Sequence, residues 1–121
     1  MGHEFEELSS RVLGVAVEVH KALGPGFVEA IYQRAMEVAF QHRQIAFQRQ
    51  KEVHVYFEQV DVGVQRLELV VEDKIILELK AVKALEAVHF AQLRSYLKAT
   101  GLHTGLLNFN APTLVIKCVV L

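Results

Sequence analysis

A glutamate and a lysine stand two residues apart near the end of an apolar run, VVEDKIILELKAV, residues 70–82. Side chains in a β-strand alternate between faces, so Glu78 and Lys80 would share one face with Ile76. An acid and a base held side by side on one strand are the kind of groups that form half of an active site. The same pair also fits a solvated edge, because charged residues are mostly exposed.

A second carboxylate, Glu68, lies ten residues before Glu78 on the preceding apolar run. The turn between the two runs decides whether the two side chains meet. A two-residue turn would place them on opposite faces, whereas a three-residue turn at 72–74 would place Glu68 directly across from Glu78. Three-residue hairpin loops are common but favour a glycine, which is missing here, so the residues alone leave both registers open.

The second register needs an explanation, because like charges directly across from each other on a sheet repel. A divalent cation between the two carboxylates would remove that repulsion. Mg²⁺ is bound in proteins by one or two carboxylates together with water and substrate phosphate. Lys80 would then be placed to orient a water or to stabilise charge on a phosphate.

The spacing of apolar residues predicts the elements that would position these groups. Helical spacing covers 5–23 and 27–43, and Pro25 in LGPG separates the two helices. Period-two spacing predicts three strands, KEVHVYFEQV, VQRLELVV and KIILELKAV, with EQVDVG as the first turn. The amphipathic segment ALEAVHFAQLRSYLKATG is a predicted helix that ends at Gly101, and TGLLNFN and TLVIKCVVL are predicted strands. Short connections make the first three strands an antiparallel meander, and the helix allows a crossover back onto the sheet. The expected fold is an α/β domain with a mixed sheet flanked by helices.

Composition narrows the class of protein. A chain of 121 residues with 52% hydrophobic residues has the length of one domain, here 1–121, with a substantial core. No apolar run approaches the ~20 residues of a membrane span, so no membrane association is expected. A net charge of −1 weighs against a strongly basic nucleic-acid-binding surface. The single cysteine, Cys118, fits a reducing compartment such as the cytoplasm, and its strand position suggests a small core residue.

Several blocks of the chain occur in a recognisable order. GFVEAIY (26–32) has a Gly-x-x-Glu-x-x-Tyr pattern, and EVHKALGPG, ELKAV, HFAQLRSYL and GLLNFN accompany it. Together these blocks, from about residue 8 to the end, resemble the GxxExxY family, a branch of the PD-(D/E)xK nuclease superfamily. The resemblance implies a restriction-endonuclease-like core of helix, antiparallel three-strand meander, helix and strand, which agrees with the predicted order. It also implies a metal-dependent nuclease acting on DNA or RNA.

The resemblance implies catalytic roles for four residues. Glu29 would be the helix carboxylate that reaches the metal, and Glu78 and Lys80 would be the E-x-K pair. Glu68, Glu78 and Glu29 would then hold Mg²⁺ or Mn²⁺, which leads us to predict the three-residue register for the hairpin. Glu68 stands where the family usually has an aspartate, and the extra methylene moves the carboxylate by roughly 1.5 Å. Weaker metal binding, a preference for Mn²⁺ or loss of activity are the possible consequences.

Supporting roles are implied for residues on the helices. Gln92 and Tyr96, four residues apart, resemble the QxxxY element that supports the site in several nuclease branches. His89 shares their helix face. Tyr32, one turn after the helix carboxylate, is placed either to hydrogen-bond it or to pack. His20 falls in the last turn of its helix, where the helix dipole favours a histidine in a structural role.

Three functions stay open on the sequence. The first is hydrolysis of nucleic acid, and the second is a catalytically impaired nuclease fold kept as a binding or assembly module. The third is an enzyme acting on another phosphorylated substrate. Arg66, Lys83, Arg94 and Lys98 would give the site a positive rim for phosphate contacts, or they are ordinary solvated residues. A homodimer is expected, because so short and apolar a chain would bury an edge or a face against a second copy.

Overall fold

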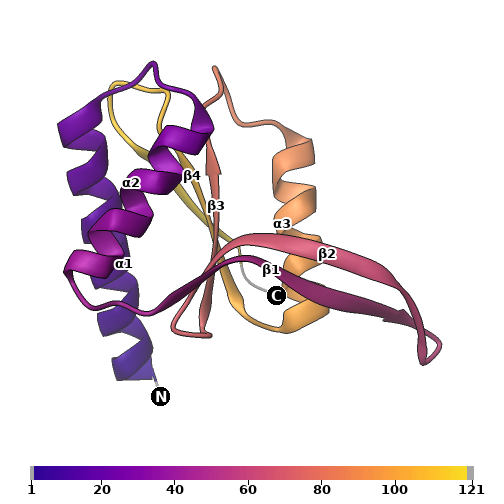
Figure 1. Cartoon of the computed structure of the whole chain (residues 1–121). Coiled ribbons are helices and arrows are strands. Elements are labelled where there is room, and N and C mark those ends of the chain that lie inside the picture. Colours follow the sequence, from indigo (N-terminus) through magenta and orange to yellow (C-terminus); the bar gives the residue numbers. More distant parts are fainter. Residues whose placement is uncertain (1, 120–121) are drawn as a thin grey trace.

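The computed structural model describes residues 2–119 of the chain, and the side chains of residues 6–118 (Figure 1). The elements follow in the order α1 (Gly2–Leu23), α2 (Glu29–His42), β1 (Phe47–Phe57), β2 (Val60–Val71), β3 (Ile75–Lys80), α3 (Ala87–Thr100), β4 (His103–Asn108) and β5 (Val115–Val119). This is the predicted order of two helices, three strands, a helix and two strands. The last two residues of the predicted final strand, 120–121, lie outside the described part.

One mixed sheet organises the chain, in the strand order β1-β2-β3-β4-β5. β3 and β4 run parallel, because α3 carries the chain back across the sheet, and the other neighbouring pairs are antiparallel. Helices α1 and α2 cover one face and α3 covers the other (Figure 1). The predicted α/β class with helices flanking a mixed sheet is confirmed.

Each face of the sheet has its own apolar cluster. On the side of α1 and α2, the alternate residues Leu77 and Leu79 of β3 pack with Phe40 and Phe109. On the α3 side, the cluster is smaller, and its buried members are Leu67, Val70, Ile76 and Tyr96. Since Leu77 and Leu79 face the larger cluster, alternation places Glu78 on the side of α3. The strand therefore has an apolar face and a face that carries the E-x-K pair.

The first hairpin differs from the prediction that EQVDVG forms its turn. Only Glu58 and Gln59 turn, with φ of 48° and 69°, and β2 begins at Val60. A two-residue turn with both φ values positive matches the twist of the flanking strands, which lets pairing continue up to the turn. The result is a long β1–β2 hairpin that projects past α3 (Figure 1).

Two further boundaries and one burial prediction are corrected. α2 begins at Glu29 and not at residue 27, because Val28 is extended with ψ of 157°. α3 begins at Ala87 and not at residue 84, after Glu86 and His89 form a capping box at its start. Cys118 is exposed, so its prediction as a core residue is wrong. It lies on β5, an edge strand of the sheet, which has a neighbour on one side only.

Candidate active site

The β2–β3 turn adopts the three-residue register, with Val71 paired to Ile75. The predicted register is therefore confirmed. Two non-glycine residues, Glu72 and Asp73, take up φ of 54° and 55°. Two hydrogen bonds hold Glu72 to Ala46. The N–H of Glu72 donates to Ala46 O at 2.9 Å, and its Oε1 accepts from Ala46 N at 3.1 Å. This anchoring of the turn to the start of β1 replaces the glycine that a free loop would favour.

The two strands stop pairing where the carboxylates stand. The last regular pair is Leu69 with Leu77, and the next position along places Glu68 across from Glu78. There the Oε1 of Glu68 accepts a hydrogen bond from the backbone N–H of Leu79 at 3.3 Å. A side-chain carboxylate thus takes over the role of a strand partner, and this fixes Glu68 beside β3.

Glu78 is the most perturbed acid at this place. Burial, hydrogen bonding with Glu68 and the charge of Glu68 raise the pKa of Glu78 to about 9, although Lys80 opposes the shift. The residue is only 1% exposed, and its Oε1 has no hydrogen-bond partner among the described residues. Near neutral pH the pair therefore holds a proton, and one buried oxygen is left without a partner.

Glu29 and Lys80 complete the set of predicted catalytic residues. Glu29 lies in the first turn of α2, and its Oε1 is 3.8 Å from the Nζ of Lys80 at the end of β3. Partial burial raises the pKa of Glu29. The charge of Lys80 opposes this rise, the charge of Glu68 adds to it, and His89 also opposes it. The structure thus brings all four residues into one electrostatic neighbourhood, with Glu29 paired to the lysine.

Tyr96 approaches the carboxylates from α3. Burial together with the charges of Glu78 and Glu68 raises the pKa of Tyr96 to about 12, so its hydroxyl stays protonated. Gln92, one turn earlier, opposes that shift by hydrogen bonding with Tyr96, while its own side chain is largely exposed. Tyr96 of the predicted Gln92–Tyr96 element therefore lies beside Glu78.

The Gly-x-x-Glu-x-x-Tyr stretch forms a structural unit at the start of α2. Gly26 adopts φ of +111°, a conformation that L side chains rarely take. The hydroxyl of Tyr32 donates to Gly24 O at 2.5 Å and accepts from Phe27 N at 3.2 Å. Tyr32 thus bonds the incoming loop and not Glu29. It fixes the direction from which α2, and with it the first-turn carboxylate, approaches the sheet.

Two other residues prove to hold the framework together. His20 is buried, and its Nε2 is 2.8 Å from Ala111 O, so it links α1 to the loop between β4 and β5. Asn108 was not singled out from the sequence, although it lies in the GLLNFN block. Its side chain accepts from Val82 N at 3.1 Å and donates to Val82 O at 2.9 Å, which fixes the chain directly after Lys80. The signal in the sequence that could have identified Asn108 is an amide side chain at the end of an apolar strand.

The predicted positive rim is dispersed. Arg66 lies on β2 and pairs with Glu52 at 3.3 Å, while Lys83 and Arg94 are exposed. Lys98 lines an open groove between α3 and the hairpin, together with Tyr56. The four cations lie on β2, after β3 and on α3, and the ion pair of Arg66 is with Glu52 and not with Glu68 or Glu78.

The carboxylate pair fits a hard divalent cation. Within the described part of the chain, no three His, Cys, Asp or Glu side chains are grouped closely enough to hold a metal ion. Two of the three predicted ligands, Glu68 and Glu78, do converge, and an unpartnered buried oxygen of Glu78 belongs to that pair. Mg²⁺ needs only one or two protein carboxylates, with water and substrate filling the remaining positions. The donor set is therefore sufficient.

The raised pKa of Glu78 predicts a pH-dependent stability. Between pH 4.5, the ordinary pKa of a glutamate, and about pH 9, the Glu78 carboxyl is ionised in the unfolded chain and protonated in the folded chain. Stability is therefore greatest below that range and falls as the pH rises through it. At about 1.4 kcal/mol per pH unit for one proton, we expect the parent to lose up to about 4 kcal/mol between about pH 6 and pH 9 relative to Glu78→Gln. Urea unfolding at both pH values measures this, and parallel curves for the two proteins would contradict it.

The family model described as the PD-(D/E)XK nuclease superfamily matches residues 6–119. No curated protein and no solved structure matches the chain. None of the helices in the described part is long and apolar enough to cross a membrane. The matched range contains the hairpin, the E-x-K pair and both supporting helices, and the chain belongs to the PD-(D/E)XK nuclease superfamily.

Proposed function

We propose that the chain hydrolyses phosphodiester bonds of nucleic acid with the help of Mg²⁺ or Mn²⁺. The observation that supports this most is the convergence of Glu68 and Glu78 where β2 and β3 stop pairing, with one buried oxygen unpartnered. Two acidic side chains that share a proton in the metal-free protein are ready to exchange that proton for a cation. Membership in a nuclease superfamily supports the same reading.

The residues divide the work as follows. Glu68 and Glu78 hold the cation, which when bound supplies Lewis-acid polarisation of the phosphate and a more acidic water. Lys80, 17% exposed, offers its ammonium group to the negative charge that develops on the phosphate. Glu29 keeps that ammonium in place through their ion pair and serves as an outer ligand. Tyr96 keeps its proton and remains a hydrogen-bond donor to Glu78.

A second candidate is a nuclease fold that no longer cleaves and acts as a binding or assembly module. Two observations favour it. The family's usual aspartate is replaced by Glu68, and the third carboxylate, Glu29, is already occupied by Lys80. An enzyme for another phosphorylated substrate would use the same groups.

A cleavage screen separates these functions. Labelled single- and double-stranded DNA and RNA are incubated with the chain in Mg²⁺, in Mn²⁺ and in EDTA, with Glu78→Gln as the matched inactive control. We expect products in Mn²⁺ or Mg²⁺, none in EDTA and none with the control. Equal product from parent and control would mean a contaminating nuclease, and no product in either metal would favour the binding module.

Glu68→Asp tests whether the family's shorter side chain gives the better metal geometry. The change withdraws the carboxylate by roughly 1.5 Å and keeps its charge. We expect Mn²⁺ binding to tighten by roughly 3- to 10-fold, equivalent to about 1 kcal/mol, and cleavage to rise with it. Calorimetry and the cleavage assay measure the two effects. Weaker binding in the variant would show that this site is adapted to glutamate.

We infer further that the chain belongs to the GxxExxY branch, since Gly26, Glu29 and Tyr32 each have a distinct part in the start of α2. We also infer that it is one domain that works in the cytoplasm as a homodimer.

The tip of the β1–β2 hairpin supports self-association, because five large apolar residues there are at least half exposed, namely Tyr56, Phe57, Val60, Val62 and Val64. Light scattering at tens of micromolar should give twice the chain mass, and Phe57→Ser should reduce it. A monomeric parent would refute the dimer.

A further inference from the structure

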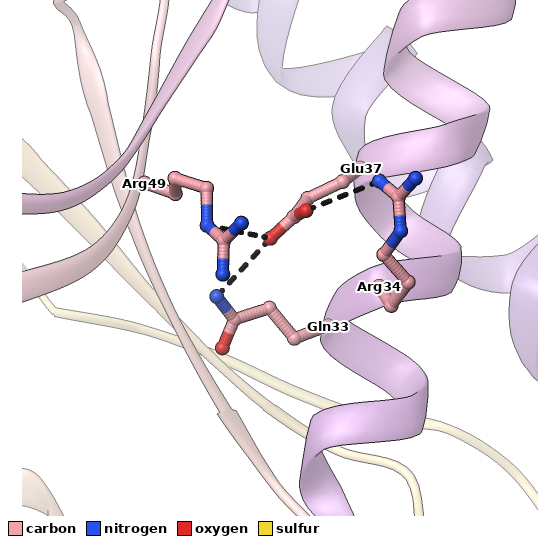
Figure 2. Close-up of polar contacts among 4 residues, drawn as sticks. All are labelled: Gln33, Arg34, Glu37 and Arg49. Carbon is pink, nitrogen blue, oxygen red and sulfur yellow. Dashed lines mark hydrogen bonds and ion pairs between the residues drawn. The ribbon is translucent and has the colours of Figure 1, made fainter.

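A second polar cluster lies on α2 beyond the candidate active site. Gln33, Arg34 and Glu37 come from α2, and Arg49 reaches them from β1 (Figure 2). The Glu37 side chain is only 3% exposed, whereas each of the two arginine side chains is 64% exposed. A buried carboxylate thus sits beneath two guanidinium groups that face solvent.

The contacts of Glu37 use both of its oxygens. Its Oε1 is 3.4 Å from Arg34 NH1, and its Oε2 accepts from Gln33 Nε2 at 3.2 Å and lies 3.7 Å from Arg49 Nε. Two cations face one anion, so the cluster carries a net positive charge of one. Each guanidinium has five N–H donors in a planar fork, and the contacts with Glu37 engage only one nitrogen of each. Most of these donors therefore remain available to a ligand.

The cluster and the candidate active site are connected by α2. Glu29, Gln33 and Glu37 follow at four-residue steps, which places neighbouring members on one stripe of the helix. Glu37 lies eight residues from Glu29, or about 12 Å along the axis at 1.5 Å per residue. Arg49 is paired in the sheet with Leu69, the direct neighbour of Glu68. Arg49 shares the sheet face of Leu69, so both arginines lie on the α2 side of the sheet, about 12 Å along α2 from the Glu29–Lys80 pair.

The expected ligand is a phosphodiester. Planar guanidinium forks match the oxygens of a phosphate, and a donor pair held in place from below loses little entropy when it binds one. A nucleic-acid strand advances about 3.4 Å per nucleotide, so ~12 Å corresponds to three or four nucleotides. A strand whose reacting phosphate lies at Lys80 would thus bring another phosphate to the arginines.

We propose that Arg34 and Arg49, held by Glu37, form a clamp for a backbone phosphate of the nucleic-acid substrate, a few nucleotides from the bond that is cleaved. This proposal rests on the proposed function, from which it takes nucleic acid as the ligand. Glu37 is the positioning residue of the clamp. If the two cations served only to neutralise Glu37, one would be enough, and a lysine would serve as well as an arginine. The presence of two arginines therefore favours a phosphate ligand.

Binding of a fluorescein-labelled DNA duplex of about 20 base pairs tests the clamp. Anisotropy is measured against salt concentration in Ca²⁺, with the integrity of the probe checked on a gel. For each lost phosphate contact the slope of log affinity against log salt falls by about 0.9, which is a loss of roughly eightfold at 0.1 M salt. We expect this loss for Arg34→Ala and for Arg49→Ala. Arg49→Lys should keep the slope but bind about threefold more weakly, because it keeps the charge and loses the fork.

The control is Arg43→Ala, which removes the arginine directly after α2, where it pairs with an exposed carboxylate, Glu18. It should leave affinity and slope unchanged. If the parent binds DNA and the two arginine variants bind as well as Arg43→Ala, the clamp is overturned and the proposed function stands. If the variants lose binding but the parent never cleaves, the clamp is supported and hydrolysis is rejected. A parent that binds neither duplex nor single strand would overturn both. Melting curves identify unfolded variants, and Arg49→Lys, which keeps the pairing with Glu37, tests the clamp if Arg49→Ala is unfolded.

Discussion

Glu78→Gln is expected to lower metal binding and cleavage together. Glutamine fills the same volume and removes the negative charge that a divalent cation requires. Loss of an outer partner of a metal ligand costs roughly 10- to 100-fold in affinity, and loss of a direct ligand should cost more. We expect cleavage to fall by at least about 1,000-fold, the upper end of what one removed electrostatic group costs. Calorimetry with Mn²⁺ and the cleavage assay measure the two losses.

The same variant should fold at least as well as the parent. The buried carboxyl beside Glu68 has a strongly raised pKa, so replacing it relieves a cost of burial near neutral pH. A variant that unfolds would show that the pair is structural. A variant that folds and binds Mn²⁺ as the parent does would remove Glu78 from the site.

Lys80→Ala is expected to separate binding from rate. Its ammonium group pairs with Glu29 and is no ligand, so both converging carboxylates stay in place when it is removed. Interactions that act only on the transition state change kcat and leave ground-state binding unchanged. We expect kcat to fall by about 100- to 1,000-fold, with Mn²⁺ affinity within about threefold of the parent.

Lys83→Ala is the matched control for this experiment, because Lys83 is exposed and lies three residues later. It should change neither quantity. A Lys80→Ala variant with an unchanged rate would assign the lysine to the ion pair alone. A large loss of Mn²⁺ affinity would mean that the lysine orients the carboxylates.

The sequence predicted most of what local spacing controls. The order of elements follows from apolar periodicity, and the position of Glu78 and Lys80 on one face follows from strand alternation. The register was correct for a reason that the sequence does not contain, since Glu72 is anchored to Ala46, a residue 26 positions earlier. Tyr32 likewise has its partner in the loop before α2, where spacing along the helix cannot point.

The unpredicted features depend on contacts between distant elements. Glu37 would be expected on a solvated helix face, whereas in the fold it is buried and Arg49 of β1 reaches it. The first turn was predicted too long, because its two residues are glutamate and glutamine, which carry no glycine signal for positive φ. The exposure of Cys118 follows from the edge position of β5, which depends on the order of strands in the sheet.

Titration of Mn²⁺ into the parent chain at about pH 7.5 tests the central claim most directly, which is that Glu68 and Glu78 form a divalent metal site. Calorimetry in two buffers with different ionisation enthalpies reports the ion and the proton together. Because the pKa of Glu78 is about 9 without metal, the predicted result is one ion bound per chain with release of about one proton. The absence of binding at millimolar Mn²⁺, or the same binding by Glu78→Gln, would contradict the claim.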